Sequence, residues 1–455
     1  MKLKKFSILL GVLLLCGKQG ESGKPNFVFI LADDLGWADV TCNFPDSFYE
    51  TPNIDKLAFQ GFRFVNAYSS CPVCSPTRAS IMTGKYPVRV GITDWIPGDD
   101  PKNRMLIGPA DRNELAAEEV TLAELLKQDG YKTCLIGKWH LGGEGFSPEN
   151  QGFEVNIGGF EAGSPPGGYY SPYKNRKMND GPQGEYLTDR QTDEAIRFME
   201  GNRENPFFVF LSYYTVHTPI QASRKHSDYY NEKSRAMNLP VIGEKLEGEG
   251  KTRINQSNPD YASMVASLDE NIGRIMKMLD ETGLSKDTWI IFTSDNGGLS
   301  TLRRGNAPTA NGPLRAGKGW CYEGGIRVPL VISGPGIGQK GMVSDYPVIS
   351  MDLFSTVIDL AGIKAPVNDG ISFVPLLASG RTPARKVLYW HYPHYHGSGW
   401  TPGSAIRLGN EKLIIRYEDN RAELYNLKDD PGEMADLSAA QRGKVRQLKK
   451  SLING

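Results

Sequence analysis

The sequence predicts an α/β protein in which helices flank a large, mainly parallel central sheet, followed by a smaller antiparallel sheet domain with a helix. Three observations lead to this prediction. Four apolar runs are rich in β-branched and aromatic residues, helical segments lie between them, and short strand-like pieces replace this pattern after Leu377. Continuous apolar runs are typical of strands buried on both faces of a parallel sheet, with helices as crossover connections.

Residues 1–20 have the pattern of an export signal. Lysines precede an apolar run from Phe6 to Leu15, which is too short to span a bilayer because a spanning helix needs about 20 residues. Cys16 follows three leucines as in a bacterial lipoprotein box, although Leu15 stands where that pattern has a small residue. We predict export to the bacterial periplasm or cell envelope, with a lipid anchor at Cys16 as the weaker alternative, and no transmembrane segment.

Each apolar run leads into polar residues. The runs at 27–31, 132–136, 207–211 and 289–292 precede, in that order, Asp33 and Asp34, Lys138 and His140, His217, and Asp295 and Asn296. Open α/β sheets bind ligands outside the carboxyl ends of their strands. Segments far apart in the chain are therefore expected to converge on one site.

The remaining segments complete the predicted architecture. Residues 121–124 have capping-box spacing, and 261–283 places its apolar side chains on one stripe. Residues 220–260 are polar and interrupted, which predicts a surface insertion near the substrate opening. Strand-like pieces at 387–392, 405–408, 412–417 and 422–427 precede a polar helix around 441–452. We expect a catalytic domain at 24–377 and a small α+β domain at 378–455.

Charge and cysteine content limit the function classes. The 52 basic residues equal the 52 acidic ones, so nucleic acid is not an expected partner and a bound anion needs a local cluster of cations. One of the six cysteines lies in the signal segment, and the five scattered cysteines that remain do not make a dense disulfide framework. Cys71 and Cys74 have the Cys-x-x-Cys spacing of redox sites and of half a zinc site, but no second pair or nearby histidine completes a zinc set.

Four residues at two strand ends offer only oxygen ligands. Asp33 and Asp34 follow one apolar run, and Asp295 and Asn296 follow another. Such a set suits a hard cation such as Ca²⁺ better than zinc. Each pair alone is explained as well by a turn, because Asp, Asn and Gly favour turns.

Cations and histidines could complete an anion site. Arg78, Lys138 and Lys318 have no acidic partner close in sequence, so they would face an anion if the fold brings them together. His140 and His217 can transfer protons near neutral pH, and the leaving oxygen of a sulfate or phosphate ester needs a proton. Taken singly, each of these residues is more often structural or solvated.

The run Cys74-Ser75-Pro76-Thr77-Arg78 resembles the signature of the type I sulfatases, in which the cysteine is oxidised to formylglycine after translation. The other motifs of that family occur along the chain in the family's order. One lies before this run, at 32–36, and the others lie after it, at 137–142, 217–219, 294–298, 317–318 with 323–329, and 423–427. Because motifs in a shared order arise by chance far less often than one motif, the chain is identified as a member of this formylglycine-dependent family. The resemblance extends from Lys24 to about Leu437 and implies an alkaline-phosphatase-like fold.

The resemblance also implies a cofactor and a metal. Sulfate transfer to a thiol would leave a thiosulfate ester with no easy exit, whereas a hydrated aldehyde can accept sulfate on one hydroxyl and release it as the other returns to the aldehyde. A maturase that generates formylglycine is then a required partner. The family pattern places Ca²⁺ on Asp33, Asp34, the modified Cys74, Asp295 and Asn296.

Catalytic roles follow from the same resemblance. Arg78 and Lys138 would steady the nucleophile and its sulfate adduct, and Lys318 would bind sulfate oxygens. His217 would protonate the leaving oxygen, and His140 would assist sulfate release. The alternatives are a phosphate or phosphonate monoester hydrolase of the same superfamily, and an unmatured, non-catalytic glycan-binding protein.

The substrate is predicted only by analogy. An envelope location favours a sulfated carbohydrate, such as a glycosaminoglycan or a galactose or N-acetylgalactosamine sulfate, attacked at a chain end. Sugar sites tend to lie at domain interfaces, although a strand edge with exposed histidines explains the same residues equally well. The candidates for this subsite are His391, His394, His396 and Trp400, with Asp94 and Trp95 as weaker ones.

Overall fold

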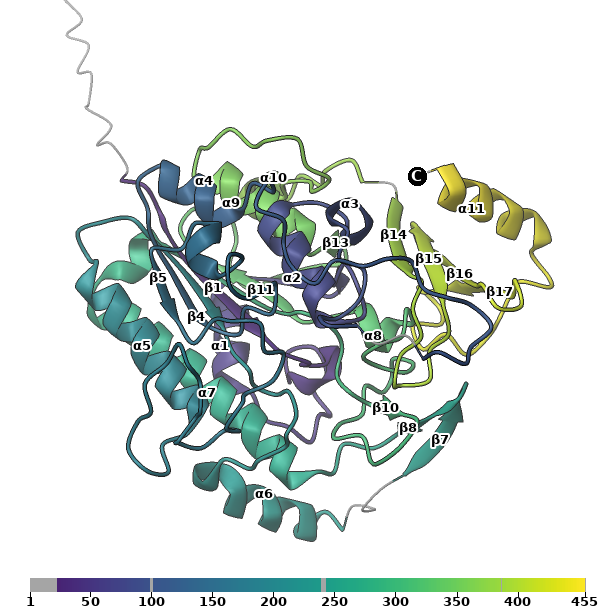
Figure 1. Cartoon of the computed structure of the whole chain (residues 1–455), viewed down its shortest axis with the longest axis horizontal. Coiled ribbons are helices and arrows are strands. Elements are labelled where there is room, and N and C mark those ends of the chain that lie inside the picture. Colours follow the sequence, from purple (N-terminus) through teal and green to yellow (C-terminus); the bar gives the residue numbers. More distant parts are fainter. Residues whose placement is uncertain (1–22, 99–100, 239–242, 386, 455) are drawn as a thin grey trace, which may run out of the picture.

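The computed structural model is built around one eight-stranded sheet (Figure 1). The structure describes residues 23–98, 101–238, 243–385 and 387–454. The strand order is β12-β2-β11-β9-β1-β6-β4-β5. Its centre consists of the four predicted apolar runs, β1 (Asn26–Ala32), β4 (Lys132–Gly137), β6 (Phe207–Ser212) and β9 (Thr288–Ser294), which run parallel to one another. The predicted α/β fold with a mainly parallel sheet is confirmed.

Shorter strands complete both edges of this sheet. β5 (Val155–Ile157) runs parallel to β4. On the other side, β11 (Leu330–Ser333) is antiparallel to both β9 and β2 (Phe62–Phe64), and β12 (Met342–Ser344) is parallel to β2. These outer strands are too short to give a clear periodic signal in the sequence.

Two hydrophobic cores lie on the two faces of the sheet. Alternate side chains of a strand point to opposite faces, and in β1 Val28 and Ile30 enter one core while Phe27 and Phe29 enter the other. Helices α1 (Pro52–Gln60), α5 (Leu187–Gly201) and α7 (Pro259–Glu281) cover the first face. Helices α2 (Cys74–Thr83), α4 (Leu122–Gln128) and α9 (Met351–Leu360) cover the second. This burial on both faces explains why the strands read as continuous apolar runs.

Two helical segments that the sequence predicted, at 121–124 and 261–283, correspond to helices in the structure. In α4, Thr121 Oγ1 accepts from the Glu124 amide at 3.1 Å and the Thr121 amide donates to Glu124 Oε2 at 2.8 Å, so the predicted capping box is present. The predicted apolar stripe lies on α7. The helices are α1 (Pro52–Gln60), α2 (Cys74–Thr83), α3 (Pro87–Val90), α4 (Leu122–Gln128), α5 (Leu187–Gly201), α6 (Arg224–Ala236), α7 (Pro259–Glu281), α8 (Glu323–Ile326), α9 (Met351–Leu360), α10 (Val374–Ser379) and α11 (Arg442–Asn454).

A second sheet forms the C-terminal part of the molecule. Its antiparallel strands are β14 (Val387–Tyr392), β15 (Gly403–Leu408), β16 (Glu411–Arg416) and β17 (Ala422–Asn426). Leu448 of α11 packs into the small core on one side of this sheet. The predicted small antiparallel sheet with a helix is confirmed, and it lies beside the main sheet at the end that carries α8 (Figure 1).

Residues 220–260 are more regular than the sequence indicated. They contain α6 and the hairpin of β7 (Glu244–Glu247) and β8 (Gly250–Arg253), which pairs with β10 (Thr301–Leu302) beyond β9. The expectation of a broken insertion is wrong for α6. Tyr230 is its only buried side chain among those described, so its packing on α7 leaves little apolar periodicity to detect.

The predicted export signal at 1–20, including Cys16, lies outside the described residues. Within the described part of the chain, no helix combines the length and the apolar character needed to cross a membrane.

A two-stranded sheet of β3 (Ala67–Tyr68) and β13 (Val348–Ile349) joins the segment before α2 to the segment before α9.

Candidate active site

Polar residues from four strand ends meet at the carboxyl edge of the main sheet. Three carboxylates there pair with three buried cations: Asp33 with Lys138 at 2.7 Å, Asp34 with Lys318 at 2.7 Å, and Asp295 with Arg78 at 2.7 Å. The partners are at least 105 positions apart in sequence. The convergence expected from the parallel sheet therefore produces one buried cluster in which the formal charges cancel.

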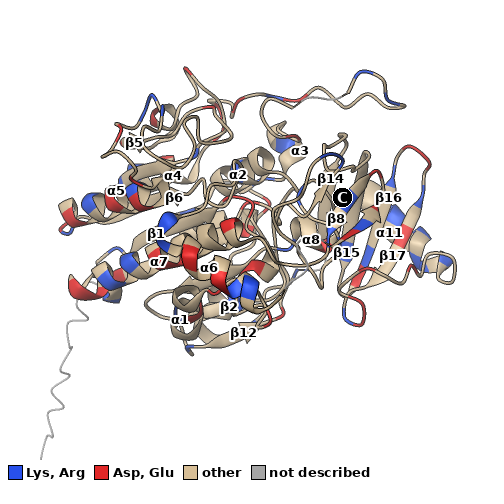
Figure 2. Ribbon diagram, turned by 90° about the horizontal axis from the view of Figure 1, so that it is seen from below, with Lys and Arg blue, Asp and Glu red and all other residues tan. Residues whose placement is uncertain are grey.

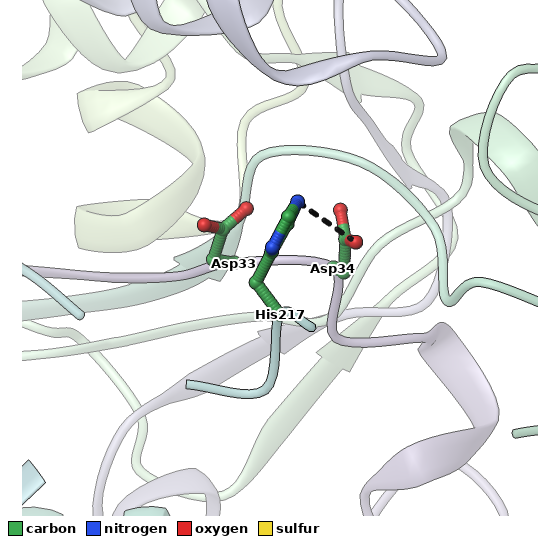
Figure 3. Close-up of side chains that lie close together, drawn as sticks. All are labelled: Asp33, Asp34 and His217. Atoms are coloured by element: carbon green, nitrogen blue, oxygen red, sulfur yellow. Dashed lines mark ion pairs between the residues drawn. The ribbon is translucent and has the colours of Figure 1, made fainter. Parts of the chain in front are cut away.

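The carboxylate cluster leaves two oxygens open. Among the buried side-chain atoms described, Asp33 Oδ1 and Asn296 Oδ1 have no hydrogen-bond partner. The Asn296 amide nitrogen donates to Asp34 Oδ1 at 2.8 Å, so its oxygen is directed elsewhere. Asp33, Asp34 and His217 offer ligand atoms within 4.8 Å of one another (Figure 3). Buried oxygens are rarely left unpaired in proteins, and open oxygens among carboxylates suit a hard cation.

The two neighbouring aspartates have opposite electrostatic surroundings. Burial and the neighbouring Asp295 raise the pKa of Asp33 above its ordinary value, although Lys138 opposes them. Burial acts in the same direction on Asp34, but Lys318 and His217 outweigh it and hold the pKa of Asp34 well below its usual range. Further positive charge beside Asp33 would therefore favour its ionised form.

Cys74 is the first residue of α2 and is buried. Pro76 stands in the first turn, where a backbone N–H would have no intrahelical partner. Thr77 Oγ1 accepts from the Cys71 amide at 3.1 Å and fixes the preceding loop. Burial raises the pKa of the Cys74 thiol more than Lys138 and Lys318 lower it. An unmodified Cys74 is therefore a poor thiolate nucleophile or redox centre.

His140 presents a basic nitrogen to residue 74. Its Nε2 lies within hydrogen-bond distance of the Ile96 carbonyl, which can only accept, so Nε2 carries the proton. Nδ1 is then the free acceptor and lies 3.3 Å from Cys74 Sγ. Burial and Lys138 lower the pKa of His140 well below its ordinary value. The imidazole is thus a neutral base directed at residue 74.

His217 is oriented by its own loop. Its Nδ1 lies 2.8 Å from the Thr218 carbonyl, and its Nε2 lies 3.7 Å from Asp34 Oδ2, as the dashed line in Figure 3 shows. Burial and Lys318 lower the pKa of His217 to about 3. His217 is uncharged in this arrangement, with Nε2 at the carboxylate cluster.

A pocket of about 510 Å³ lies over this cluster. Cys74, His140, His217 and Lys318 line it together with two of the expected sugar-subsite residues, Trp95 and His396. The His396 ring lies against Gly319, where a Cβ atom would be 2.0 Å from His396 Nδ1. The C-terminal sheet region thereby contributes a side chain beside Lys318.

The other expected subsite residues do not reach this pocket. His394 Nε2 lies 2.8 Å from Thr93 Oγ1, and Asp94 accepts from the Tyr392 hydroxyl at 2.8 Å, both in the interior. Trp400 is buried as well. His391 lies in a separate cavity of about 600 Å³ bordered by α3, the C-terminal sheet and α11. The structure therefore places the predicted sugar-subsite residues in three different environments: the active-site pocket, the protein interior and the separate cavity.

Three contributors were missed at the sequence level. Ser212 Oγ accepts from Arg78 Nη1 at 2.6 Å, and its position at the end of an apolar run could have indicated it. The Ile96 carbonyl, which orients His140, has no sequence signal because any residue supplies a carbonyl. Glu161, which also lines the pocket, lies in a polar segment without a recognisable motif.

The fold and the pocket together define a hydrolase with the alkaline-phosphatase-like architecture, and comparisons with known proteins identify the family. A family model described as Sulfatase matches residues 25–363, and one described as N-sulphoglucosamine sulphohydrolase, C-terminal, matches residues 316–454. The chain belongs to the sulfatase family and is a sulfuric ester hydrolase.

Curated relatives match over most of their length. N-acetylgalactosamine-6-sulfatase of Mus musculus is 32% identical over 91% of this chain and 76% of the relative. The Homo sapiens enzyme of the same name is 31% identical over 93% and 83%, and a sulfatase of Formosa agariphila is 29% identical over 96% and 90%.

Solved structures confirm the architecture. Ps i-CgsB in complex with k-i-k-neocarrahexaose is 30% identical, with a TM-score of 0.74 over 94% of this chain and 92% of that one. The phosphonate monoester hydrolase of Agrobacterium radiobacter, at 20% identity and a TM-score of 0.70 over 95% of each chain, shares the fold.

Proposed function

We propose that this protein hydrolyses sulfate monoesters of a carbohydrate, with formylglycine formed from Cys74 and with Ca²⁺ held by Asp33, Asp34, Asp295 and Asn296. The observation that carries the proposal is the pair of open, buried oxygens, Asp33 Oδ1 and Asn296 Oδ1, in a carboxylate cluster that contacts Lys318 and His217, which line a pocket together with residue 74. The proposal requires a maturase for Cys74 and fits an exported enzyme.

The two groups would supply what the chain lacks: a hydrated aldehyde offers an oxygen nucleophile at residue 74, and Ca²⁺ offers Lewis acidity beside it. The chain's own groups surround that position. His140 Nδ1, 3.3 Å from Sγ, can accept the proton of a hydroxyl on residue 74. Lys138 and Arg78, which pair with Asp33 and Asp295, add positive charge around residue 74.

The balance of charges explains how the site would select an anion. Three carboxylates are matched by three cations, so a divalent ion leaves the cluster positive. A sulfate monoester carries one negative charge and would be held at this position. Lys318 lines the pocket and is placed to bind sulfate oxygens.

His217 is the proposed acid for the leaving oxygen. It lines the pocket beside Lys318, and its Nε2 has no hydrogen-bond partner among the described residues other than the distant contact with Asp34. A bound sulfate ester would place negative charge next to the imidazole and raise the pKa of His217 from its low value. The proton could then pass to the departing alcohol.

The substrate proposal is a galactose or N-acetylgalactosamine sulfate at a chain end. The relatives named N-acetylgalactosamine-6-sulfatase and the carbohydrate complex of Ps i-CgsB support it. Within the pocket, Trp95 offers an aromatic face and His396 a polar one. A screen of defined sulfated mono- and disaccharides with matured enzyme tests it. Hydrolysis of phosphate esters in preference to all sulfates in a parallel assay would contradict it and favour the phosphatase alternative.

Calcium binding is expected to stabilise the protein as well as to support turnover. Dialysis against a chelator should remove activity and lower the melting temperature, and added Ca²⁺ should restore both. A ligand at 100 times its Kd stabilises the folded state by about 2.7 kcal/mol. Differential scanning fluorimetry measures the shift without requiring turnover.

The variant Asn296→Ala serves as the control for this effect. It removes one of the two open oxygens without leaving an unpaired charge, so Ca²⁺ should shift its melting temperature less than that of the parent. Identical melting curves of the parent protein with chelator and with Ca²⁺ would contradict the metal assignment.

A further inference from the structure

The pocket wall beyond the sulfate end carries little charge. Among the described lining residues, Lys318 is the only lysine or arginine and Glu161 the only acid. Lys318 already pairs with Asp34 at 2.7 Å. The apolar part of the wall consists of Trp95, Ile96, Pro97, Leu299 and Leu302. A group attached to the sugar next to the reacting sulfate would therefore meet apolar surface, uncharged polar groups or a carboxylate.

Glu161 is held close to the reactive centre by its own segment. The Phe160 carbonyl accepts from the His140 amide at 3.1 Å. Two residues beyond Glu161, a Cβ atom at Gly163 would lie 2.7 Å from His140 Nε2, so this segment passes directly against the imidazole. The position of Glu161 relative to the catalytic histidine is thus set by backbone contacts.

One oxygen of Glu161 is bound on the side away from the pocket. Arg176 forms an ion pair with Glu161 Oε2, and its guanidinium lies over the Phe160 ring at 5.2 Å from the ring centroid. Arg176 lines a different cavity, with Lys177, and not the active-site pocket. Glu161 Oε1 accepts no hydrogen bond from the residues that the structure describes, and the side chain is 45% exposed.

His396 adds a polar group without adding charge. The Ser398 amide donates to His396 Nδ1 at 3.1 Å, so Nε2 carries the proton of the neutral ring. Burial and Lys318 lower the pKa of His396 to about 3. An uncharged donor and a carboxylate acceptor match the hydroxyl groups of a sugar, and neither supplies a positive charge for a second anion.

The overall charge of the chain does not compensate for the small number of cations in the pocket. Figure 2 shows acidic and basic residues interspersed along α5, α6 and α7, and the whole chain has a formal net charge of zero. The net charge of the chain therefore adds no overall attraction for a polyanionic ligand.

We propose that Glu161 restricts this enzyme to sugars that carry one sulfate, at the reacting position, with uncharged neighbouring groups. This inference rests on the proposed sulfatase function and names the substrate class of the same pocket. A second sulfate elsewhere on the same sugar would approach the open Glu161 Oε1, because Arg176 pairs with Oε2 and does not line the pocket. Like charges at short distance near a protein surface repel by amounts that correspond to tenfold effects or more.

The test compares kcat/KM for N-acetylgalactosamine 6-sulfate and N-acetylgalactosamine 4,6-disulfate with matured enzyme. The parent should prefer the monosulfate by about tenfold or more, and Glu161→Gln should raise the disulfate-to-monosulfate ratio by about tenfold. The matched control is Glu149→Gln, because Glu149 pairs with Lys177 at 2.8 Å, is 39% exposed and does not line the pocket. It should leave the ratio unchanged.

Salt gives a second readout. Raising ionic strength from about 0.1 M to 1 M shortens the Debye length from about 10 Å to 3 Å. The preference of the parent enzyme for the monosulfate should therefore become smaller. The disulfate-to-monosulfate ratio of kcat/KM for Glu161→Gln should change less than that of the parent. Equal hydrolysis of both sulfates by the parent, or an unchanged ratio in Glu161→Gln, would overturn the inference alone. Turnover of neither sulfate and of no galactose sulfate would contradict the proposed function and the inference with it.

Discussion

Replacing Cys74 with alanine is expected to lower turnover by about 10⁵-fold or more, the scale seen when an enzyme loses its nucleophile, and to leave the fold intact. Residue 74 is the only proposed source of the attacking oxygen. Its sulfur contacts His140 Nδ1 at 3.3 Å, so the substitution leaves no charge unpaired. Rates on a sulfated sugar and thermal unfolding followed by circular dichroism measure the two effects.

Cys71→Ala is the matched control for this prediction. Cys71 is buried three residues earlier and its sulfur faces the Thr93 carbonyl at 3.9 Å, away from the pocket lining. The Cys71→Ala variant should retain turnover, whereas a redox mechanism would need both Cys71 and Cys74. Full activity of Cys74→Ala, or an unmodified Cys74 mass in active parent enzyme, would refute the formylglycine mechanism.

Replacing Arg78 with alanine is expected to destabilise the protein by about 3–5 kcal/mol, because it breaks a buried ion pair by removing one partner. The guanidinium is 1% exposed and donates to Asp295 Oδ2, to Ser212 Oγ and to the Lys138 carbonyl. Its loss leaves Asp295 uncompensated. Urea unfolding of Arg78→Ala in the Cys74→Ala background measures this effect without interference from maturation.

The comparison for Arg78 is an exposed ion pair. Arg89 is 49% exposed and pairs with Asp369 on the surface, so Arg89→Ala should change the free energy of unfolding by about 1 kcal/mol or less. Arg78→Lys keeps the charge but loses the planar fork that binds Asp295 through Nε and Nη2, and it should fall between the two. Equal stabilities of Arg78→Ala and Arg89→Ala would show that the buried network is not a major source of stability.

The parts of the fold that could be predicted are those with a strong local signal. The four central strands are continuous apolar runs because both faces of β1, β4, β6 and β9 are buried. The capping box at Thr121 is a contact between residues three positions apart. By contrast, α6 buries one described side chain, Tyr230, and β2 and β11 are only three and four residues long, so none of these elements produces a readable period.

The sequence by itself determined the mainly parallel α/β architecture, the sulfatase-like run from Cys74 to Arg78, and the order in which polar residues follow the strands. These are properties of neighbouring residues, and the parallel sheet then brings strand ends to one edge. Only the tertiary structure decided which side chains face the pocket. It placed His396 there and His391 elsewhere, because contacts such as that of His396 with Gly319 join residues far apart in the chain. It also decided the tautomer of His140, because the Ile96 carbonyl that selects it belongs to another loop and is invisible in the side-chain pattern.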